Sequence, residues 1–397
     1  MQLACTGSEA VENALRLAQH AQGRRRRGVA YATNSFHGKT RGALSVTDSP
    51  LCRATVRLPQ GGVRVPFGDV AALAGLLRRD RSIGTVILEP VQGGAGIVVP
   101  PPGYLAAVRQ LCDKHDVLWI ADEVQSGCGR TGRFFAFEHE DVVPDIVTLA
   151  KSLGGGKAAI AATICTRAVA RRAHRGSAAL HHTPGTFAGT GEACATAITA
   201  LNVLYDEGLL DNARIIGAYL TGELEALARR HPGLIAEVRG KGLMIGLEFT
   251  GAARAGLRAL GPVASAMDRA LPGGLAVAVG SLLKSEHSVL VGFTDYNRNV
   301  LRLQPPLGIE HKHVDQLVAA LDDLLSRGAL RLGADFLRTG RAPRAPGGAC
   351  DAPGTPGAHR PRTPERTGSE QRAPGAPFSG ERVRRRAAHP GARAAAP

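Results

Sequence analysis

Short apolar runs alternate with longer amphipathic segments in the first half of the chain. The apolar runs occupy residues 28–32, 85–88, 117–121, 146–150 and 160–165, and polar or glycine-rich turns follow them. Residues 9–20, 70–78 and 103–115 carry apolar side chains at helical spacing. Apolar runs of this length are typical of buried strands. The order of strands and helices therefore predicts an α/β fold: an open, mostly parallel sheet flanked by helices on both faces.

The pattern changes in the second half. Helices are predicted over 192–204 and 209–230, and from residue 234 onward short strands (238–247, 289–291 and 300–303) alternate with helices (263–270 and 313–325). This alternation predicts a smaller α+β domain. We therefore predict a large domain over 1–233, a small domain over 234–330 and a tail over 331–397.

The tail differs in composition from the rest of the chain. From Gly333 onward it holds 12 arginines against five acids, which accounts for +7 of the net charge of +15, and ten of the 24 prolines. A segment rich in Arg, Pro, Gly and Ala with few large apolar side chains does not bury enough surface to fold, so we predict disorder. The arginines at 382–386 could contact nucleic acid, but no aromatic side chains accompany them for base stacking, so a solvated extension is the preferred interpretation.

The cysteines and the N-terminal sequence indicate the cellular compartment to expect. The seven cysteines among 397 residues are scattered and form no C-x-x-C pair, which favours a reducing compartment. No basic leader and no uncharged apolar stretch of about 18 residues is present, so a cytoplasmic, non-membrane protein is expected. The paired histidines at 181–182 lack a third ligand at a useful spacing, and no metal is expected.

Two polar residues stand where neighbouring apolar runs end. Asp122 follows the run at 117–121, and Lys151 follows the run at 146–150. The carboxyl ends of parallel strands meet at one edge of a sheet, where ligands bind. A lysine there can hold an aldehyde cofactor as a Schiff base while a carboxylate keeps a pyridine nitrogen protonated. Lysine is rare here, at seven residues against 42 arginines, and only lysine can lose its proton to become a nucleophile.

Each candidate residue also fits an ordinary structural role. Asp122 alone could cap a helix, and Lys151 alone could be a solvated loop residue. Ser8 is a plausible N-cap for the first helix, or Gly7 and Ser8 bind a phosphate at the helix N-terminus. Phe36 either plugs the core or stacks on a planar cofactor. Thr186, in a glycine-rich loop, could donate a hydrogen bond to a phosphate.

Several motifs in a fixed order carry a family resemblance. They are Thr-Gly-Ser-Glu-Ala at 6–10, Phe-His-Gly-Lys-Thr at 36–40, Leu-Glu-Pro-Val-Gln-Gly at 88–93, Ala-Asp-Glu-Val-Gln-Ser-Gly at 121–127, Gly-Arg-Thr-Gly at 129–132, Leu-Ala-Lys-Ser-Leu-Gly-Gly-Gly at 149–156, Thr-Phe at 186–187, Arg-Gly-Lys-Gly at 239–242 and Arg-Leu-Gln-Pro-Pro-Leu at 302–307. Over about residues 3–325 the chain resembles the class III (ω-amino acid) aminotransferases. These are pyridoxal-phosphate enzymes of fold type I. Within the class it is most similar to the putrescine enzymes, with the ornithine and acetylornithine enzymes close.

The resemblance implies roles for individual residues. Lys151 would hold the pyridoxal 5'-phosphate and move a proton, Asp122 would pair with the pyridine nitrogen, and Gln125 would bind the ring's 3-oxygen. The other residues implied to bind cofactor are Gly7, Ser8, Phe36 stacked on the ring, His37, Glu89, and Thr186 reaching a neighbouring subunit's phosphate. Arg302 would bind the substrate's α-carboxylate. The implied reaction is ping-pong transfer of a primary amino group from an ω-amine donor, such as putrescine or an ornithine-like amine, to 2-oxoglutarate or another oxo acid, by a homodimer or higher homo-oligomer.

Three departures from the family pattern keep an alternative open. The family carries a segment ahead of the phosphate-binding turn that would supply part of the fold, and here only five residues precede that turn. Gly94 stands where the family usually has a glutamate, which is expected to leave Arg302 without an acidic partner. Ala-Gly-Thr-Gly at 188–191 replaces the usual Gly-Gly-Asn-Pro after Thr186. The alternative is an inactive, aminotransferase-like remnant with a binding role only.

Overall fold

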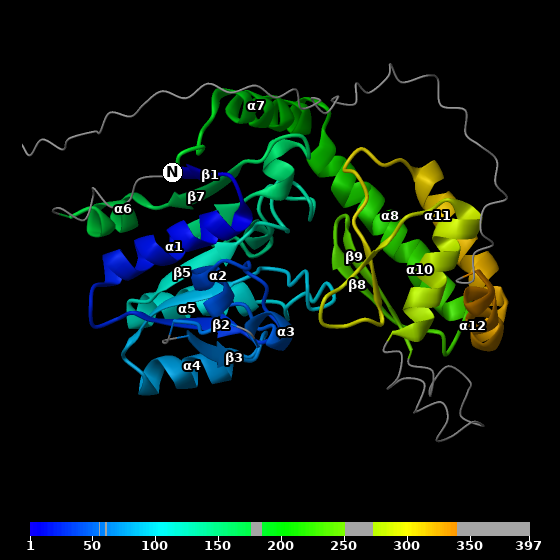
Figure 1. The fold of residues 1–397 in the computed structure, drawn as a ribbon, viewed down its shortest axis with the longest axis horizontal. Helices are drawn as coiled ribbons and strands as arrows, with labels where there is room; N and C mark the ends of the chain where they lie inside the picture. The colour runs from blue at the N-terminus through cyan, green and yellow to red at the C-terminus, as the bar shows by residue number, and fades with distance from the viewer. Residues whose placement is uncertain (55, 60–61, 176–184, 251–272, 340–397) are drawn as a thin grey trace, which may run out of the picture. The chain divides into compact units, whose positions relative to one another are not determined.

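The computed structural model describes residues 1–54, 56–59, 62–175, 185–250 and 273–339. The chain divides into two units, 1–342 and 343–397, and the described residues all lie in the first. This unit contains two sheets, each with its own core (Figure 1). In the described part of the chain, no helix combines the length and apolar character needed to cross a membrane.

A seven-stranded sheet forms the first part. Its strands are β1 (Gln2–Ala4), β2 (Gly28–Ala32), β3 (Gly62–Val65), β4 (Ile83–Leu88), β5 (Leu118–Asp122), β6 (Ile146–Leu149) and β7 (Ala161–Cys165), in the spatial order β1-β7-β6-β5-β4-β2-β3. The strands from β3 to β6 run parallel, whereas β7 is antiparallel to both β6 and β1. The predicted mostly parallel α/β sheet is confirmed, and an antiparallel edge completes it.

Helices cover both faces of this sheet (Figure 1). On one face lies α1 (Gly7–Gln22), whose Val11, Leu15 and Leu17 pack with Ile87 and Ile120. On the other face lie α4 (Val70–Arg79) and α5 (Tyr104–His115), which pack with the intervening strand residues such as Trp119 and Ala121. Successive strand residues point to opposite faces, so a continuous apolar run serves both cores at once.

The second part is built on a smaller antiparallel sheet. Strands β8 (Ile235–Lys241), β9 (Met244–Phe249), β10 (Gly292–Phe293) and β11 (Val300–Leu303) lie in the order β10-β11-β9-β8. Apolar side chains of α8 (Leu209–Arg230), α10 (Gly274–His287) and α11 (His311–Ser326) join β9 and β11 in one core. The remaining helical elements are α2 (Arg41–Ser45), α3 (Pro50–Arg53), η1 (Ala136–Glu140), η2 (Lys151–Gly154), α6 (Arg167–Ala173), α7 (Gly191–Asp206) and α12 (Gly328–Thr339).

Some predicted boundaries change. Residues 289–291 lie outside any strand, because β10 begins at Gly292. The N-cap of α1 is Thr6 rather than Ser8: the Thr6 hydroxyl accepts from the Glu9 amide while the Glu9 carboxylate accepts from the Thr6 amide, a complete capping box. In the turn that precedes β2, Arg26 donates to the carbonyl oxygens of Asp116 and His115.

The predicted tail boundary also moves. The predicted tail includes residues 331–339, but they belong to α12, where Leu332 is fully buried against the core of the smaller sheet. The amphipathic Ala-Leu-Arg-Leu-Gly-Ala-Asp-Phe-Leu pattern at 329–337 explains this helix. The rest of the predicted tail, the helix over 263–270 and the paired histidines at 181–182 lie outside the described residues.

Candidate active site

A cavity of about 320 Å³ lies at the carboxyl ends of β4, β5 and β6. Cavities near this size accept small cofactors. Eight of the ten predicted site residues line it: Gly7, Ser8, Phe36, His37, Glu89, Asp122, Gln125 and Lys151. They come from five separate stretches of sequence that the parallel sheet brings to one edge, which is the usual place for a ligand in an open α/β sheet.

Asp122 ends β5 and is held by three donors. Its Oδ2 lies 2.6 Å from His37 Nδ1, and its Oδ1 accepts from the Thr148 hydroxyl at 2.9 Å and the Val124 amide at 3.1 Å. Both Asp122 and His37 are almost fully buried. These three contacts fix the position and orientation of the carboxylate at the end of the central strand, where it faces the cavity.

Lys151 follows β6 and has an uncommon backbone conformation. Its φ is +47°, in the left-handed region that side chains other than glycine rarely adopt. Strain of this kind costs of order 1–3 kcal/mol and concentrates at functional sites. The side chain stands in the open cavity, so part of its surface is accessible, yet burial of the amine among protein atoms lowers its pKa. The carboxylates of Asp122 and Glu89 oppose that lowering.

The N-terminus of α1 faces the same cavity. Gly7 and Ser8 are the first two residues of the helix, so their amides have no partner within the helix and the positive end of the helix dipole points outward. Gly7 has no room for a side chain, because a Cβ would lie 2.9 Å from Val124 Cγ1. This corner of the cavity suits an anion such as a phosphate.

Glu89 closes the end of β4. It is fully buried, and its carboxylate accepts from the Phe36 amide at 3.0 Å and the Gly93 amide at 3.1 Å. Burial raises its pKa to about 7 against the opposing field of His37. These two hydrogen bonds from backbone amides fix the loop that carries Phe36 and the loop that begins at Gly93. Glu89 therefore shapes the cavity wall from which Phe36 projects.

Arg302 lies in a second cavity of about 310 Å³ that shares Phe36, Gln125 and Lys151 with the first. Gln125 lines both cavities. Its Nε2 donates to Gln304 Oε1 at 3.1 Å. Arg302 comes from β11, so this cavity is lined by both sheets. Within the described part of the chain, Arg302 has no carboxylate within ion-pair distance, as the glycine at position 94 predicts.

Thr186 is the one predicted site residue that the structure leaves out of both cavities. It is exposed and lines neither of them. Its predicted contact with a second subunit's phosphate stays a prediction.

Comparisons with known proteins show which family the chain belongs to. The profile of the family described as aminotransferase class-III matches residues 1–325. The chain belongs to the class-III aminotransferase family. Its fold is the fold type I architecture of that family, with Asp122 and Lys151 in the motifs that carry the resemblance.

Individual relatives in this family are moderately similar to the chain. The chain is 37% identical over 345 residues to aminotransferase PigE of Serratia sp. (strain ATCC 39006), and the match covers 79% of this chain but 40% of that protein. It therefore spans about two fifths of the length of this curated relative. The ornithine aminotransferase of Toxoplasma gondii ME49 is 30% identical with a TM-score of 0.71, covering 82% of this chain and 72% of that one. A PLP-bound amine transaminase from an uncultivated Pseudomonas species is 29% identical with a TM-score of 0.72, covering 83% and 77%.

The residues present fit the cofactor that class-III aminotransferases use. Asp122 offers a fixed carboxylate for a protonated ring nitrogen, Lys151 an amine for an aldehyde, and α1 an N-terminus for a phosphate. His37 Nε2 is buried and has no hydrogen-bond partner among the described residues. A polar atom left over in this way at the cavity wall is consistent with a ligand that completes the site.

Three residues that support the candidate site were not predicted. Thr148, one residue before the end of β6, donates to Asp122, and its position on the strand gives no local signal of that contact. Glu123 follows Asp122 but turns away, bonding the Ser126 hydroxyl at 2.5 Å and the Phe137 amide at 3.0 Å. Gln304 holds Gln125 from 179 residues away. The Asp-Glu pair at a strand end could have indicated a second buried acid. No local sequence pattern indicates the long-range contact between Gln125 and Gln304.

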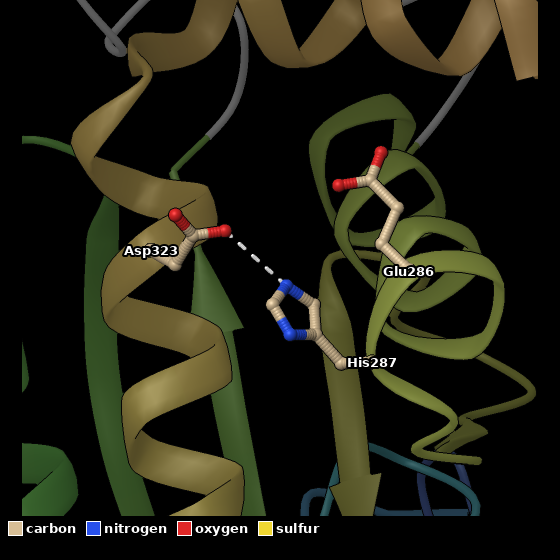
Figure 2. Close-up of side chains that lie close together, drawn as sticks. All are labelled: Glu286, His287 and Asp323. Carbon is tan, nitrogen blue, oxygen red and sulfur yellow. Dashed lines mark ion pairs between the residues drawn. The ribbon is translucent and has the colours of Figure 1, made fainter.

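A second group of ionisable residues lies on α10 and α11 (Figure 2). Glu286 and His287 end α10, and Asp323 projects from α11, with His287 Nε2 3.3 Å from Asp323 Oδ2. Arg327 already binds both carboxylates, at 2.8 Å to Glu286 and 2.7 Å to Asp323. A divalent cation would have to displace this guanidinium. The group is therefore an ion-pair network that joins two helices.

Proposed function

We propose that this chain is a pyridoxal-phosphate-dependent aminotransferase that moves a primary amino group from an ω-amine donor, such as putrescine, another diamine or an ornithine-like amine, to 2-oxoglutarate or another oxo acid. The observation that carries the proposal is the presence of Asp122, Lys151 and the N-terminus of α1 around one cavity. The ornithine aminotransferase and amine transaminase among the solved relatives support the choice of donor class.

The cofactor, when bound, supplies an aldehyde and an electron-accepting ring. Asp122 would hold a proton on a ring nitrogen placed against it, because three hydrogen bonds keep its carboxylate oriented toward the cavity. Lys151 is more readily deprotonated at neutral pH than an ordinary lysine, since burial lowers its pKa. Its neutral amine can act as a nucleophile and then move a proton at the donor carbon that bears the amino group.

Two further residues select and orient what enters. Phe36 projects into both cavities and offers a flat apolar wall to a planar ring. Arg302 offers a planar guanidinium that binds a carboxylate in two-point fashion. We propose a ping-pong order: the donor leaves as an aldehyde before the oxo acid enters and binds Arg302. The net reaction exchanges an amino group for a carbonyl oxygen, so no external oxidant is needed.

A homodimer or larger homo-oligomer is also part of the proposal. Large apolar side chains on and before α7 are exposed in the single chain: Phe187 is 72% exposed, Ile198 60% and Tyr205 59%. Such exposed side chains are typical of a surface that a partner covers. Thr186 lies at the start of this surface, which supports its predicted contact with a second copy. The six described cysteines are all free, which supports a cytoplasmic location.

The absorption spectrum of the purified protein tests the proposal. Incubation with pyridoxal phosphate is expected to give a visible band that Lys151→Ala abolishes, and glutamate should form when an amine donor and 2-oxoglutarate are added. Lys157→Ala, which removes a lysine outside the cofactor cavity, is the matched control and should keep the band. A band without amino transfer to any oxo acid would favour the inactive remnant, and no band at all would refute cofactor binding.

A further inference from the structure

A turn of the small domain is anchored against the loop at Gly94. The amides of Asp295 and Tyr296 both donate to the Gly94 carbonyl, each at 3.1 Å. The Tyr296 hydroxyl donates to the Ser35 carbonyl at 2.9 Å, and the Thr294 hydroxyl closes the turn by donating to the Asn297 carbonyl. Four hydrogen bonds thus fix the position of Asp295 although its side chain is exposed.

Gly94 is the residue that makes this position available. A Cβ at residue 94 would lie 3.1 Å from Tyr296 Cε2, 3.4 Å from Asp295 Oδ2 and 3.5 Å from Phe36 Cβ. A longer side chain at residue 94 would have to occupy the space that the turn fills. Asp295 therefore brings a carboxylate to within van der Waals distance of where a side chain at residue 94 would begin.

Asp295 partly offsets the positive charge of the second cavity. Among the described residues that line it, Asp295 is the one acid, against Arg130, Lys151 and Arg302. Its side chain has no hydrogen-bond or ion-pair partner in the described part of the chain. The Asp295 carboxylate acts on Lys151 by raising the pKa of that amine, while Arg302 lowers it, so both charges lie close enough to be felt at the reacting group.

Some of the other polar groups of this cavity are engaged. Arg130 donates to the carbonyl oxygens of Pro305 and Leu243, and Gln304 Oε1 accepts from Gln125, while Gln304 Nε2 has no hydrogen-bond partner among the described residues. The side chains of Arg302 and Asp295 have no hydrogen-bond or ion-pair partner in the described part of the chain, so both can interact with what enters. The cavity thus offers one site for a carboxylate and one for an ammonium group, both beside Lys151.

We propose that Asp295 is a specificity-determining residue that binds the distal ammonium group of a diamine donor while the other amino group meets Lys151. The inference rests on the proposed aminotransferase function and names the residue that selects the donor. Arg302 repels the same ammonium and serves the acceptor's carboxylate instead. Gly94 and Asp295 act together, since the glycine provides the space in which the acid stands.

Substrate pairs that differ by one charge test this role. The wild-type protein with bound cofactor is assayed for kcat/KM with putrescine and cadaverine, and with butylamine and pentylamine, which lack the distal amine. Asp295→Asn is expected to lower kcat/KM about tenfold for the diamines, the order expected between an exposed ion pair and a charged hydrogen bond, and to change the monoamine values less than about threefold. Asp295→Glu should retain the diamine preference and shift it toward putrescine, because its carboxylate reaches further.

A binding measurement that does not depend on turnover accompanies these assays. Calorimetric titration of putrescine and butylamine into the cofactor-free protein should show putrescine binding weakened about tenfold by Asp295→Asn. Glu225→Gln is the matched control, since it removes one negative charge from the exposed face of α8, away from both cavities. It should leave both ligands unaffected.

The outcomes separate the two proposals. Unchanged ratios of diamine to monoamine in Asp295→Asn, with active wild-type protein, would overturn the role of Asp295 and leave the aminotransferase function standing. Equal losses for both amine classes would show that Asp295 only supports the fold, which also overturns the inference. Absence of amino transfer from every amine by the wild type would instead refute the proposed function.

Discussion

Glu123 provides a test of the site through the pH dependence of stability. It is fully buried beside Asp122, and burial raises its pKa from 4.5 to about 7 although Ser126 and the amide of Phe137 bond its carboxylate. Glu123→Gln keeps the shape and removes the titration. An amide at this position can still accept from the Phe137 amide and donate to the Ser126 hydroxyl.

The expected magnitude follows from proton linkage. Because the folded pKa is above the unfolded one, the folded state holds a proton between pH 4.5 and 7 that the unfolded chain has released. The protonated carboxyl's contribution to stability is fully present below pH 4.5, is lost as pH rises toward 7, and stays lost above it. At about 1.4 kcal/mol per pH unit, the free energy of unfolding falls by about 3 kcal/mol between pH 5 and pH 8 through Glu123 alone.

Urea denaturation of the wild type and of Glu123→Gln at pH 5 and pH 8 measures this quantity. Titration of every other group is common to both proteins, so it cancels when the pH-dependent change in the variant is subtracted from that in the wild type. The variant should gain about 3 kcal/mol relative to the wild type between the two pH values. Glu225→Gln, on the exposed face of α8, is the control and should show no such gain.

A relative gain smaller than about 0.5 kcal/mol would refute the reasoning. It would mean that the bonds from Ser126 and Phe137 compensate burial and that Glu123 is ionised at neutral pH like an exposed glutamate. A gain of similar size in both Glu123→Gln and the control would point to a general effect of net charge instead.

Two further predictions concern packing and cofactor binding. On α8, Gly217→Ala should destabilise the fold by at least 2 kcal/mol, because the new Cβ would lie 2.3 Å from the Gly242 carbonyl carbon, whereas Gly222→Ala, with open space around it, should stabilise by about 0.5–1 kcal/mol. Thermal unfolding of both variants measures these changes in stability. Equal changes in the two variants would contradict the close approach of Gly217 to Gly242. Thr148→Val removes a donor to Asp122 and should weaken cofactor affinity about tenfold, measured by titrating pyridoxal phosphate against the visible band. Unchanged affinity would show that the remaining two donors suffice.

The main elements of the fold could be predicted because hydrophobic runs are bounded by strong local signals. β2, β11 and α8 begin and end where the sequence indicated, since arginines, asparagine or glycine stand beside each apolar segment. The same logic placed Asp122 and Lys151 at neighbouring strand ends. Parallel pairing then brings the two residues to one cavity without any further information from the sequence.

Short or exposed elements gave no comparable signal. β1 has three residues and pairs only with β7, and β3 alternates exposed and buried positions over four residues, so neither differs locally from a loop. Ser8 and Thr6 are equally good caps by residue type, and the glutamate three residues after Thr6 decides between them.

Long-range polar contacts could not be predicted for a different reason. The docking of Asp295 on Gly94 depends on where the small sheet lies against the large one, and nothing near either residue encodes that distance. The contact of Arg26 with Asp116, 90 residues later, is of the same kind. Such contacts follow from the assembled fold rather than from local pattern.

The left-handed backbone at Lys151 implies a conflict between folding and chemistry. Glycine adopts φ near +47° without penalty, so selection for thermal resistance alone would favour Lys151→Gly and raise the melting temperature. A library screened only for heat tolerance should therefore enrich glycine at this codon. A lysine at this position indicates that the protein requires the amine despite the strained backbone.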